Sequence, residues 1–80
     1  MHELGILIHA LKQVAHIAKS NHIRRIKAIT LEIGEQSGVV IPYLLKLYPA
    51  AVAQFSMLRD AELLIHCCPG NNMTIKDIRY

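Results

Sequence analysis

The spacing of apolar residues constrains the fold more than any other feature, because it changes period along the chain. In residues 3–19 apolar side chains recur every three or four positions, which is the period of one face of a helix. In residues 26–35 they alternate with other residues, with Ile29, Leu31 and Ile33 on one side, which is the pattern of a half-buried strand. The chain is therefore expected to open with an amphipathic helix, which a strand follows.

A second helix is predicted after a glycine-rich turn. Gly34 and Gly38 bracket the sequence GEQSG, and glycine permits the positive φ values that many turns require. Pro42 suits the first turn of a helix, where its missing N–H has no intrahelical partner to lose. We expect this helix to run to about Met57 with a kink at Pro49, because an internal proline removes a hydrogen bond.

Two further strands are predicted at the end of the chain. Residues 61–67 alternate like the first strand, and residues 73–79 do so only if a bulge separates Ile75 from Ile78. The order helix, strand, helix, strand, strand favours an α+β fold, with two helices packed on one face of a small three-stranded sheet. The connection CCPGNN contains turn-forming residues, so we expect it to close a hairpin that pairs the last two strands antiparallel.

Size and charge limit what the chain can do. Its 80 residues make one small domain, in which a single core yields roughly 3–5 kcal/mol of net stability, so a metal or a partner would help. The net charge is +3, and its only local concentration is Lys19, Arg24, Arg25 and Lys27. No aromatic residues interleave with these cations to stack on bases, so we expect a solvated helix end and no nucleic-acid partner.

Neither a targeting segment nor a disulfide is expected. The apolar runs stop well short of the roughly 20 residues that a membrane span needs, and the start of the chain does not resemble a signal peptide. Cys67 and Cys68 are adjacent, so they can hardly bridge each other without distorting the peptide between them. We therefore expect a cytoplasmic protein with reduced thiols and no membrane partner.

Three short motifs occur in order along the chain: MHEL at the first residue, LEIGEQSGV at residues 31–39, and AEL followed by a terminal IKDI. Together they make the chain similar to the hydrogenase nickel-incorporation protein family, HypA. The resemblance implies that an N-terminal Met-His-Glu begins a nickel-binding domain, and that the strand carrying Ile-Gly-Glu leads through Ser-Gly into the second helix. It covers nearly the whole chain, and MHE combined with IGEQSG is a specific pattern.

One part of the family's pattern is missing. The resemblance implies a zinc-binding segment between the last two strands, with two Cys-x-x-Cys pairs that form a tetrahedral thiolate site. Here HCCPGNN provides only two adjacent thiols and a turn, which cannot surround zinc within one chain. We therefore expect residues 1–80 to be a single nickel-binding domain without the zinc segment.

The first three residues carry the candidate nickel site. A bulky His2 should block removal of the initiator methionine, which leaves the α-amine of Met1 as the terminus. The Met1 amine and the His2 amide nitrogen would close a five-membered chelate on one metal, and that amide with His2 Nδ1 would close a six-membered one. Glu3 would complete the site through its amide nitrogen or its carboxylate. Planar nitrogen donors suit Ni(II) or Cu(II), and the choice of nickel comes from the resemblance.

The alternative for this segment is an ordinary exposed His2 beside an acid at a helix N-terminus, where Glu3 complements the helix dipole. His9 and His16 lie on roughly the same helical face as His2, but about 10 Å from each other, too far apart to share a metal. We expect them to form a solvated stripe. His22 is expected to be plain surface in the basic turn.

A second candidate metal site lies at the end of the second predicted strand. His66, Cys67 and Cys68 would bind zinc between molecules if a second chain supplied another set of ligands. The alternative is that Cys67 points into the core as a small hydrophobe, with Cys68 at a turn. Within a single chain we expect the alternative.

Two functions remain open on the sequence alone. The first is a nickel metallochaperone in hydrogenase maturation, for which the resemblance implies a HypB-type GTPase and the hydrogenase large subunit as partners. The second is an interaction module that has lost metal delivery and binds a maturation partner or itself. We also allow for a homodimer, because nothing obvious covers the sheet edge. No catalytic triad, paired carboxylates or phosphate-binding loop occurs, so an enzyme is not expected.

Overall fold

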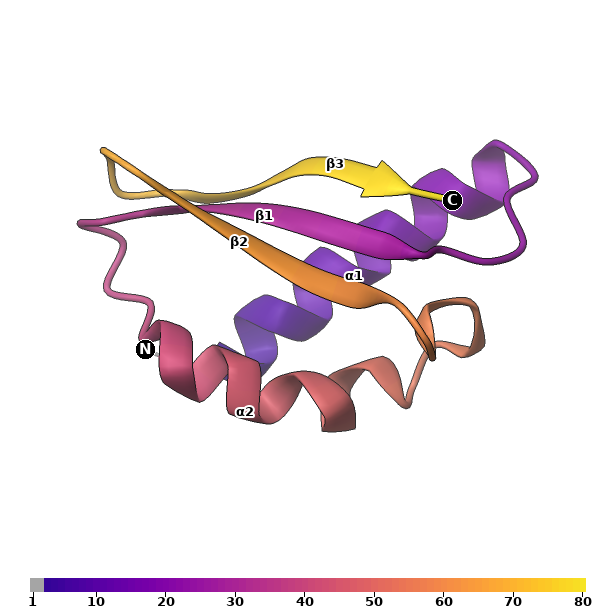
Figure 1. Cartoon of the computed structure of the whole chain (residues 1–80), viewed down its shortest axis with the longest axis horizontal. Helices are drawn as coiled ribbons and strands as arrows, with labels where there is room; N and C mark the ends of the chain where they lie inside the picture. Colours follow the sequence, from indigo (N-terminus) through magenta and orange to yellow (C-terminus); the bar gives the residue numbers. More distant parts are fainter. Residues whose placement is uncertain (1–2) are drawn as a thin grey trace.

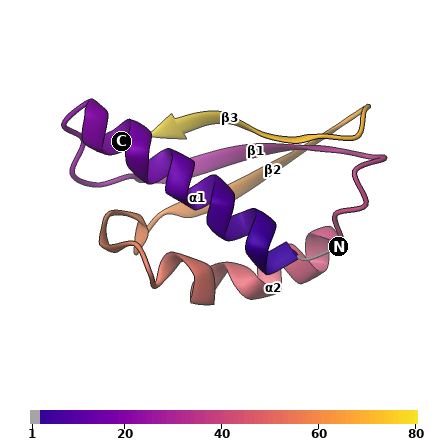
Figure 2. The ribbon, with the colours of Figure 1, turned by 180° about the vertical axis from the view of Figure 1, so that it is seen from behind.

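The computed structural model describes residues 3–80, and Met1 and His2 lie outside the described residues. Two helices cover one face of a three-stranded sheet, and the other face is open (Figures 1 and 2). The predicted α+β architecture is therefore confirmed. The elements are α1 (Glu3–Ser20), β1 (Ala28–Gly34), α2 (Ile41–Val52), the short 3-10 helix η1 (Ser56–Leu58), β2 (Glu62–Cys68) and β3 (Met73–Arg79).

The strand order corrects the predicted hairpin. β1 lies in the middle of the sheet, parallel to β2 on one side and antiparallel to β3 on the other, so β2 and β3 do not pair with each other. A parallel neighbour requires a crossover connection, and α2 provides it between β1 and β2. The connection of residues 69–72 then passes the end of β1 to reach its free edge, where the Gly34 N–H donates to the Asn72 carbonyl at 2.8 Å. This order places the most buried strand between two neighbours.

The predicted bulge in β3 is confirmed. Thr30 lies opposite Asp77 and Leu31 lies opposite Ile75, so Lys76 is the extra residue. Ile75 and Ile78 both pack against the core in spite of their odd spacing.

The core lies between α1 and the sheet, as the two periodicities predict. Leu7, Leu11 and Val14 of α1 are at most 1% exposed, and they belong to the same buried cluster as Ile29 and Leu31 of β1. The buried side of β1 is the one that alternation indicates, with Ile33 at its end also 2% exposed.

The second helix is shorter than predicted. α2 begins at Ile41, one residue before Pro42, but it ends at Val52 and not at Met57. Because Pro49 has no N–H to donate to the preceding turn, the helix loses a bond in its last turn and continues for only three residues beyond that proline. The chain then forms η1, which buries Leu58. The kink at Pro49 stays a prediction.

The end of α1 is formed by a specific hydrogen-bonding pattern. The Ile23 N–H donates to the Ala18 carbonyl at 2.8 Å, and the His22 N–H donates to the Lys19 carbonyl at 3.2 Å. His22 has a φ of 58°, so it occupies the left-handed position that usually takes glycine in this motif. The exposed His22 thus terminates the helix where the sequence predicts an end.

Candidate metal centre

Glu3 is the one described residue of the predicted nickel segment, and its side chain is buried. It is 5% exposed, although it carries a carboxylate. Its Oε2 accepts a hydrogen bond of 3.2 Å from the N–H of Val40, which is the N-cap residue of α2. A carboxylate at this position meets the unbonded N–H groups and the positive end of the helix dipole. Glu3 therefore complements the dipole of α2 and ties the start of α1 to the start of α2.

The loop before α2 is shaped by the motif residues that precede Val40. The Ser37 N–H donates to the Gly34 carbonyl at 3.0 Å, and Ser37 Oγ accepts from the Val39 N–H at 3.2 Å. Gly38 has a φ of 79°, a value that a residue with a side chain rarely adopts. The predicted GEQSG turn is therefore confirmed, and it delivers the Val40 N–H to Glu3.

The same motif is clamped to the connection between β2 and β3. Gln36 is bonded twice to Gly70: its N–H donates to the Gly70 carbonyl at 2.8 Å, and its Oε1 accepts from the Gly70 N–H at 2.9 Å. The Glu35 N–H donates to the Cys68 carbonyl at 2.8 Å. A Cβ on Gly34 would overlap the Gly70 carbonyl, so only glycine fits there without a shift of the backbone. The motif therefore links two chain segments as well as leading into α2.

Met1 and His2, the other predicted nickel ligands, lie outside the described residues. The start of α1 lies beside the loop that enters α2, because Glu3 accepts the Val40 N–H (Figure 2). Sequence reasoning assigned Glu3 to the site but missed Val40, whose contribution is a main-chain donor 37 positions away in the chain. No side-chain pattern in the sequence reports such a contact.

The second candidate site is divided between the two faces of the sheet. His66 Nδ1 lies 3.3 Å from Glu32 Oε2 on a neighbouring strand, and both side chains are partly exposed. Cys67 follows His66 directly in β2, and consecutive strand residues point to opposite faces. Cys67 is exposed and Cys68 is half-buried, so the expectation that Cys67 packs in the core is wrong. Cys67 lies on the edge strand β2, whereas its register partner Ile33 on the central strand is buried.

Residues 3–80 contain no group of three or more His, Cys, Asp or Glu side chains placed to hold a metal ion. The intermolecular site at His66, Cys67 and Cys68 stays a prediction.

The remaining histidines and the basic group lie on the surface, as expected. His9 and His16 are exposed on α1, and His9 Nε2 lies 3.5 Å from Gln13 Nε2. The basic group is also exposed, and its Arg25 pairs with Asp60 at 3.2 Å. The exposed members of this group are Lys19, Arg24, Arg25 and Lys27.

Tyr48 joins α2 to the residue that precedes β2. Its phenol donates to the Ala61 carbonyl at 2.8 Å, and burial raises the pKa of Tyr48 to about 12. The hydroxyl therefore stays protonated as a donor across the neutral range.

A comparison with known proteins identifies the family of this chain. A family model described as hydrogenase/urease nickel incorporation, metallochaperone, hypA, matches residues 1–75. The chain belongs to the HypA family. Its members are metallochaperones and not enzymes, so the predicted family and the expected lack of enzymatic activity are both confirmed. The HypA chain is thus a nickel metallochaperone of hydrogenase or urease maturation.

The fold agrees with a solved member of this family. The solution structure of the Ni metallochaperone HypA from Helicobacter pylori matches with a TM-score of 0.87, at 16% identity, over 99% of this chain and 97% of that one. At this identity the match shows the fold alone. A search of curated proteins gives no match. None of the helices in residues 3–80 has the length and apolar character that a membrane span requires.

Proposed function

We propose that this HypA chain binds Ni(II) at its N-terminus and delivers it to the large subunit of a hydrogenase. The donors are the Met1 amine, the His2 amide nitrogen, His2 Nδ1 and the main-chain amide nitrogen of Glu3. Such a set of nitrogens suits the tetragonal preference of Ni(II) or Cu(II), and the description of the HypA family names nickel. Nickel is the cargo here, and an exposed terminal chelate suits a site that must also release it.

The buried Glu3 side chain supports this choice of donors. Glu3 is 5% exposed and its carboxylate accepts the Val40 N–H at 3.2 Å, so coordinating nickel through that oxygen would deprive the Val40 N–H of this acceptor. The amide nitrogen leaves this contact intact. In this proposal Glu3 has two roles: its side chain anchors the segment at α2, and its main chain binds the metal.

The domain organisation and the partners belong to the same proposal. The connection of residues 69–72 joins β2 to β3 directly, which supports a single nickel-binding domain without a zinc-binding segment. A HypB-type GTPase cooperates with the chain in the cytoplasm, and neither nucleic acid nor membrane is a partner. A homodimer that shares zinc through His66, Cys67 and Cys68 is the less favoured form.

The test is a nickel titration of the full chain with its native, unblocked N-terminus, followed by absorbance and calorimetry. We expect about one nickel per chain. His2→Ala should abolish specific binding, and one extra residue before Met1 should do the same, because it converts the terminal amine into an amide. The matched controls are His9→Ala and His16→Ala on the exposed face of α1, which should leave binding unchanged.

Glu3→Gln separates the two possible roles of Glu3. Its amide oxygen can still accept from Val40, so binding through the main chain predicts one nickel per chain with an affinity within about threefold of the original. Loss of binding in Glu3→Gln would instead identify the carboxylate as a ligand. If the native chain takes up no nickel at all, the interaction module becomes the better function.

A further inference from the structure

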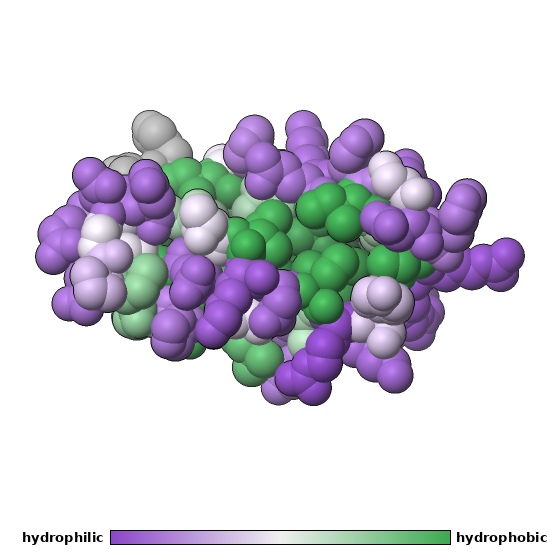
Figure 3. Space-filling view, turned by 90° about the horizontal axis from the view of Figure 1, so that it is seen from above, coloured by the Kyte–Doolittle hydropathy of each residue, from purple (hydrophilic) through white to green (hydrophobic). Residues whose placement is uncertain are grey.

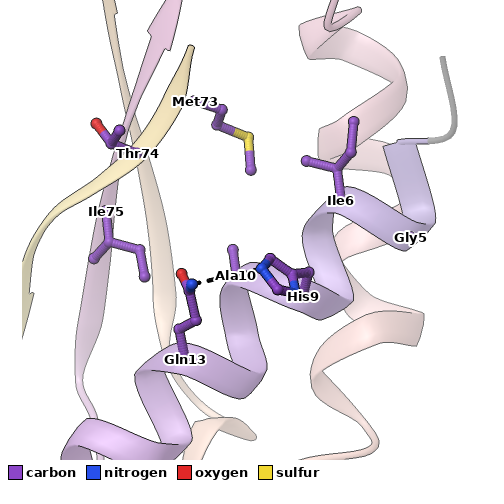
Figure 4. A pocket seen from close by; sticks show the side chains of 8 residues that line it. All are labelled: Gly5, Ile6, His9, Ala10, Gln13, Met73, Thr74 and Ile75. Atoms are coloured by element: carbon purple, nitrogen blue, oxygen red, sulfur yellow. Dashed lines mark hydrogen bonds between the residues drawn. The ribbon is translucent and has the colours of Figure 1, made fainter.

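An apolar groove separates α1 from β3, on the side of the molecule away from α2. Its volume is about 550 Å³, and its lining includes Ile6, His9, Ala10, Gln13, Met73 and Ile75. Figure 4 shows the apolar side chains from both elements pointing into the space between helix and strand. The lining is mainly carbon, so the groove suits apolar side chains better than a small polar ligand.

The groove continues along α1. A second hollow of about 460 Å³ shares His9, Gln13 and Ile75 with the first and extends it to Ile17. Figure 3 shows the apolar side chains gathered across the middle of the face seen from above, between polar margins. The 43% exposed Ile17 belongs to this surface. From Gly5 to Ile17 the helix rises by about 18 Å, which is the length of about three turns of a second helix.

A stripe of basic side chains runs along α1 beside this groove. His9, Lys12, His16 and Lys19 are separated by three, four and three positions, so they lie on one helical face, and all are exposed. None of the described residues that line the two hollows is an aspartate or a glutamate. The groove therefore combines an apolar floor with a margin of basic side chains and no carboxylates.

We propose that this groove binds an acidic amphipathic helix of a partner protein. Apolar residues at intervals of three and four on that helix fill the space between Ile6, Ile17 and Ile75. Carboxylates beside them pair with Lys12 and Lys19. This surface is distinct from the proposed nickel donors, and the inference does not depend on them.

Two other occupants fit less well. A second copy laid on the groove would bring its own Lys12 and Lys19 against the same basic stripe, which is repulsive. An extended segment would need the outer edge of β3, but the bulge at Lys76 interrupts regular pairing there. A helix needs only the side-chain surface.

The experiment uses the full isotope-labelled chain and a synthetic helical peptide of about 14 residues, with leucines on one face and glutamates beside them. A control peptide carries lysine in place of every glutamate. We expect the acidic peptide to bind with a Kd below about 1 mM and to shift amide signals of residues 5–17 and 73–75. Its affinity should fall as salt is added. The lysine peptide should bind at least tenfold more weakly.

Paired substitutions locate the surface. Lys12→Glu should weaken binding of the acidic peptide about tenfold. The control Lys46→Glu, at an exposed lysine on α2, should leave this binding unchanged. Ile17→Ser should weaken peptide binding to a similar extent, whereas Leu45→Ser on α2 should leave it unchanged. Ile17 and Leu45 are 43% and 45% exposed. Because all four positions are exposed, the variants are expected to fold, which circular dichroism checks.

Three results would overturn the proposal: no binding of the acidic peptide, equal binding of both peptides, or equal effects of the paired substitutions. Self-association of the chain that Ile17→Ser removes would overturn it too, since the occupant would then be a second copy. Sedimentation at several concentrations measures that outcome.

Discussion

The two ends of the sheet are held together in different ways. At one end, which we call the motif end, main-chain groups of residues 34–40 bond to residues 68–72 and to the Glu3 carboxylate, and the Gln36 side chain bonds to Gly70. A Cβ on Gly34 has no room there, because it would overlap the Gly70 carbonyl. At the other, the ion-pair end, Arg25 meets Asp60 in a pair whose side chains are 61% and 67% exposed, and the Tyr48 phenol bonds to Ala61. The motif end therefore depends on particular residues, whereas the ion-pair end depends mainly on general surface chemistry.

This difference shows what the family motif does in this chain. The residues of IGEQSG do not themselves form a group of metal ligands within the described chain. They place the Val40 N–H where Glu3 can accept from it and hold the short connection of residues 69–72 against β1. The motif thus builds the support on which the proposed nickel segment rests.

The largest expected effect comes from adding one methyl group at the motif end. In Gly34→Ala the new Cβ meets the backbone of Gly70 and Asn71, which cannot move aside like a side chain, so we expect a loss of at least about 3 kcal/mol in the free energy of unfolding. Urea denaturation followed by circular dichroism measures it. Gly5→Ala is the matched control: nothing lies within 4 Å of its Cβ in α1, so it should stabilise the protein by about 0.5–1 kcal/mol.

Removing the buried carboxylate should have the next largest effect. Glu3→Ala leaves the Val40 N–H without its acceptor and removes the charge at the start of α2, so we expect a loss of about 2 kcal/mol. Glu3→Gln should lose about half as much, because it keeps the hydrogen bond and removes only the charge. Equal stability of Glu3→Ala and the original chain in urea would contradict the anchoring role of Glu3.

At the ion-pair end, Tyr48 should make stability depend on alkaline pH. Its pKa is raised from 10.0 to about 12 in the folded protein by burial, so between these values the unfolded chain loses a proton that the folded protein keeps. The contribution of Tyr48 to the free energy of unfolding is fully present below pH 10 and falls as the pH rises toward 12. Because the ring is only partly buried, we expect a loss of about 1 kcal/mol, less than the full shift implies.

Urea denaturation at pH 9 and pH 11 tests the effect of Tyr48. In Tyr48→Phe the additional alkaline loss should disappear, whereas Tyr43→Phe, at a tyrosine that is 51% exposed, should retain it. An unchanged alkaline loss in Tyr48→Phe would assign it to another group.

The smallest effect is expected from the surface ion pair. Arg25→Gln and Asp60→Asn should each change the free energy of unfolding by less than about 0.5 kcal/mol, because both side chains are largely solvated. A double-mutant cycle measures the coupling between them, which should fall further in high salt. A coupling above about 1 kcal/mol would mean that this end is held more specifically than its exposure suggests.

The sequence alone determined the position of nearly every element, because side-chain period is a local property. The helical spacing of residues 3–19 and the alternation in β1 correspond closely to α1 and to the buried side of the central strand. The bulge in β3 followed from the odd spacing of Ile75 and Ile78, and the motifs identified the family. The predicted ligands Met1 and His2 also come from the sequence alone.

The tertiary structure decided how these elements meet. Two strands joined by a short turn satisfy the local rules for a hairpin, but the fold inserts β1 between them. Both edges of the most buried strand are then paired, and no local pattern records that gain. The exposure of Cys67 depends on the edge position of β2 in the sheet, and the burial of Leu58 depends on how η1 packs after α2. Glu3 and Val40 are 37 positions apart, so only the folded chain brings the carboxylate to the start of α2.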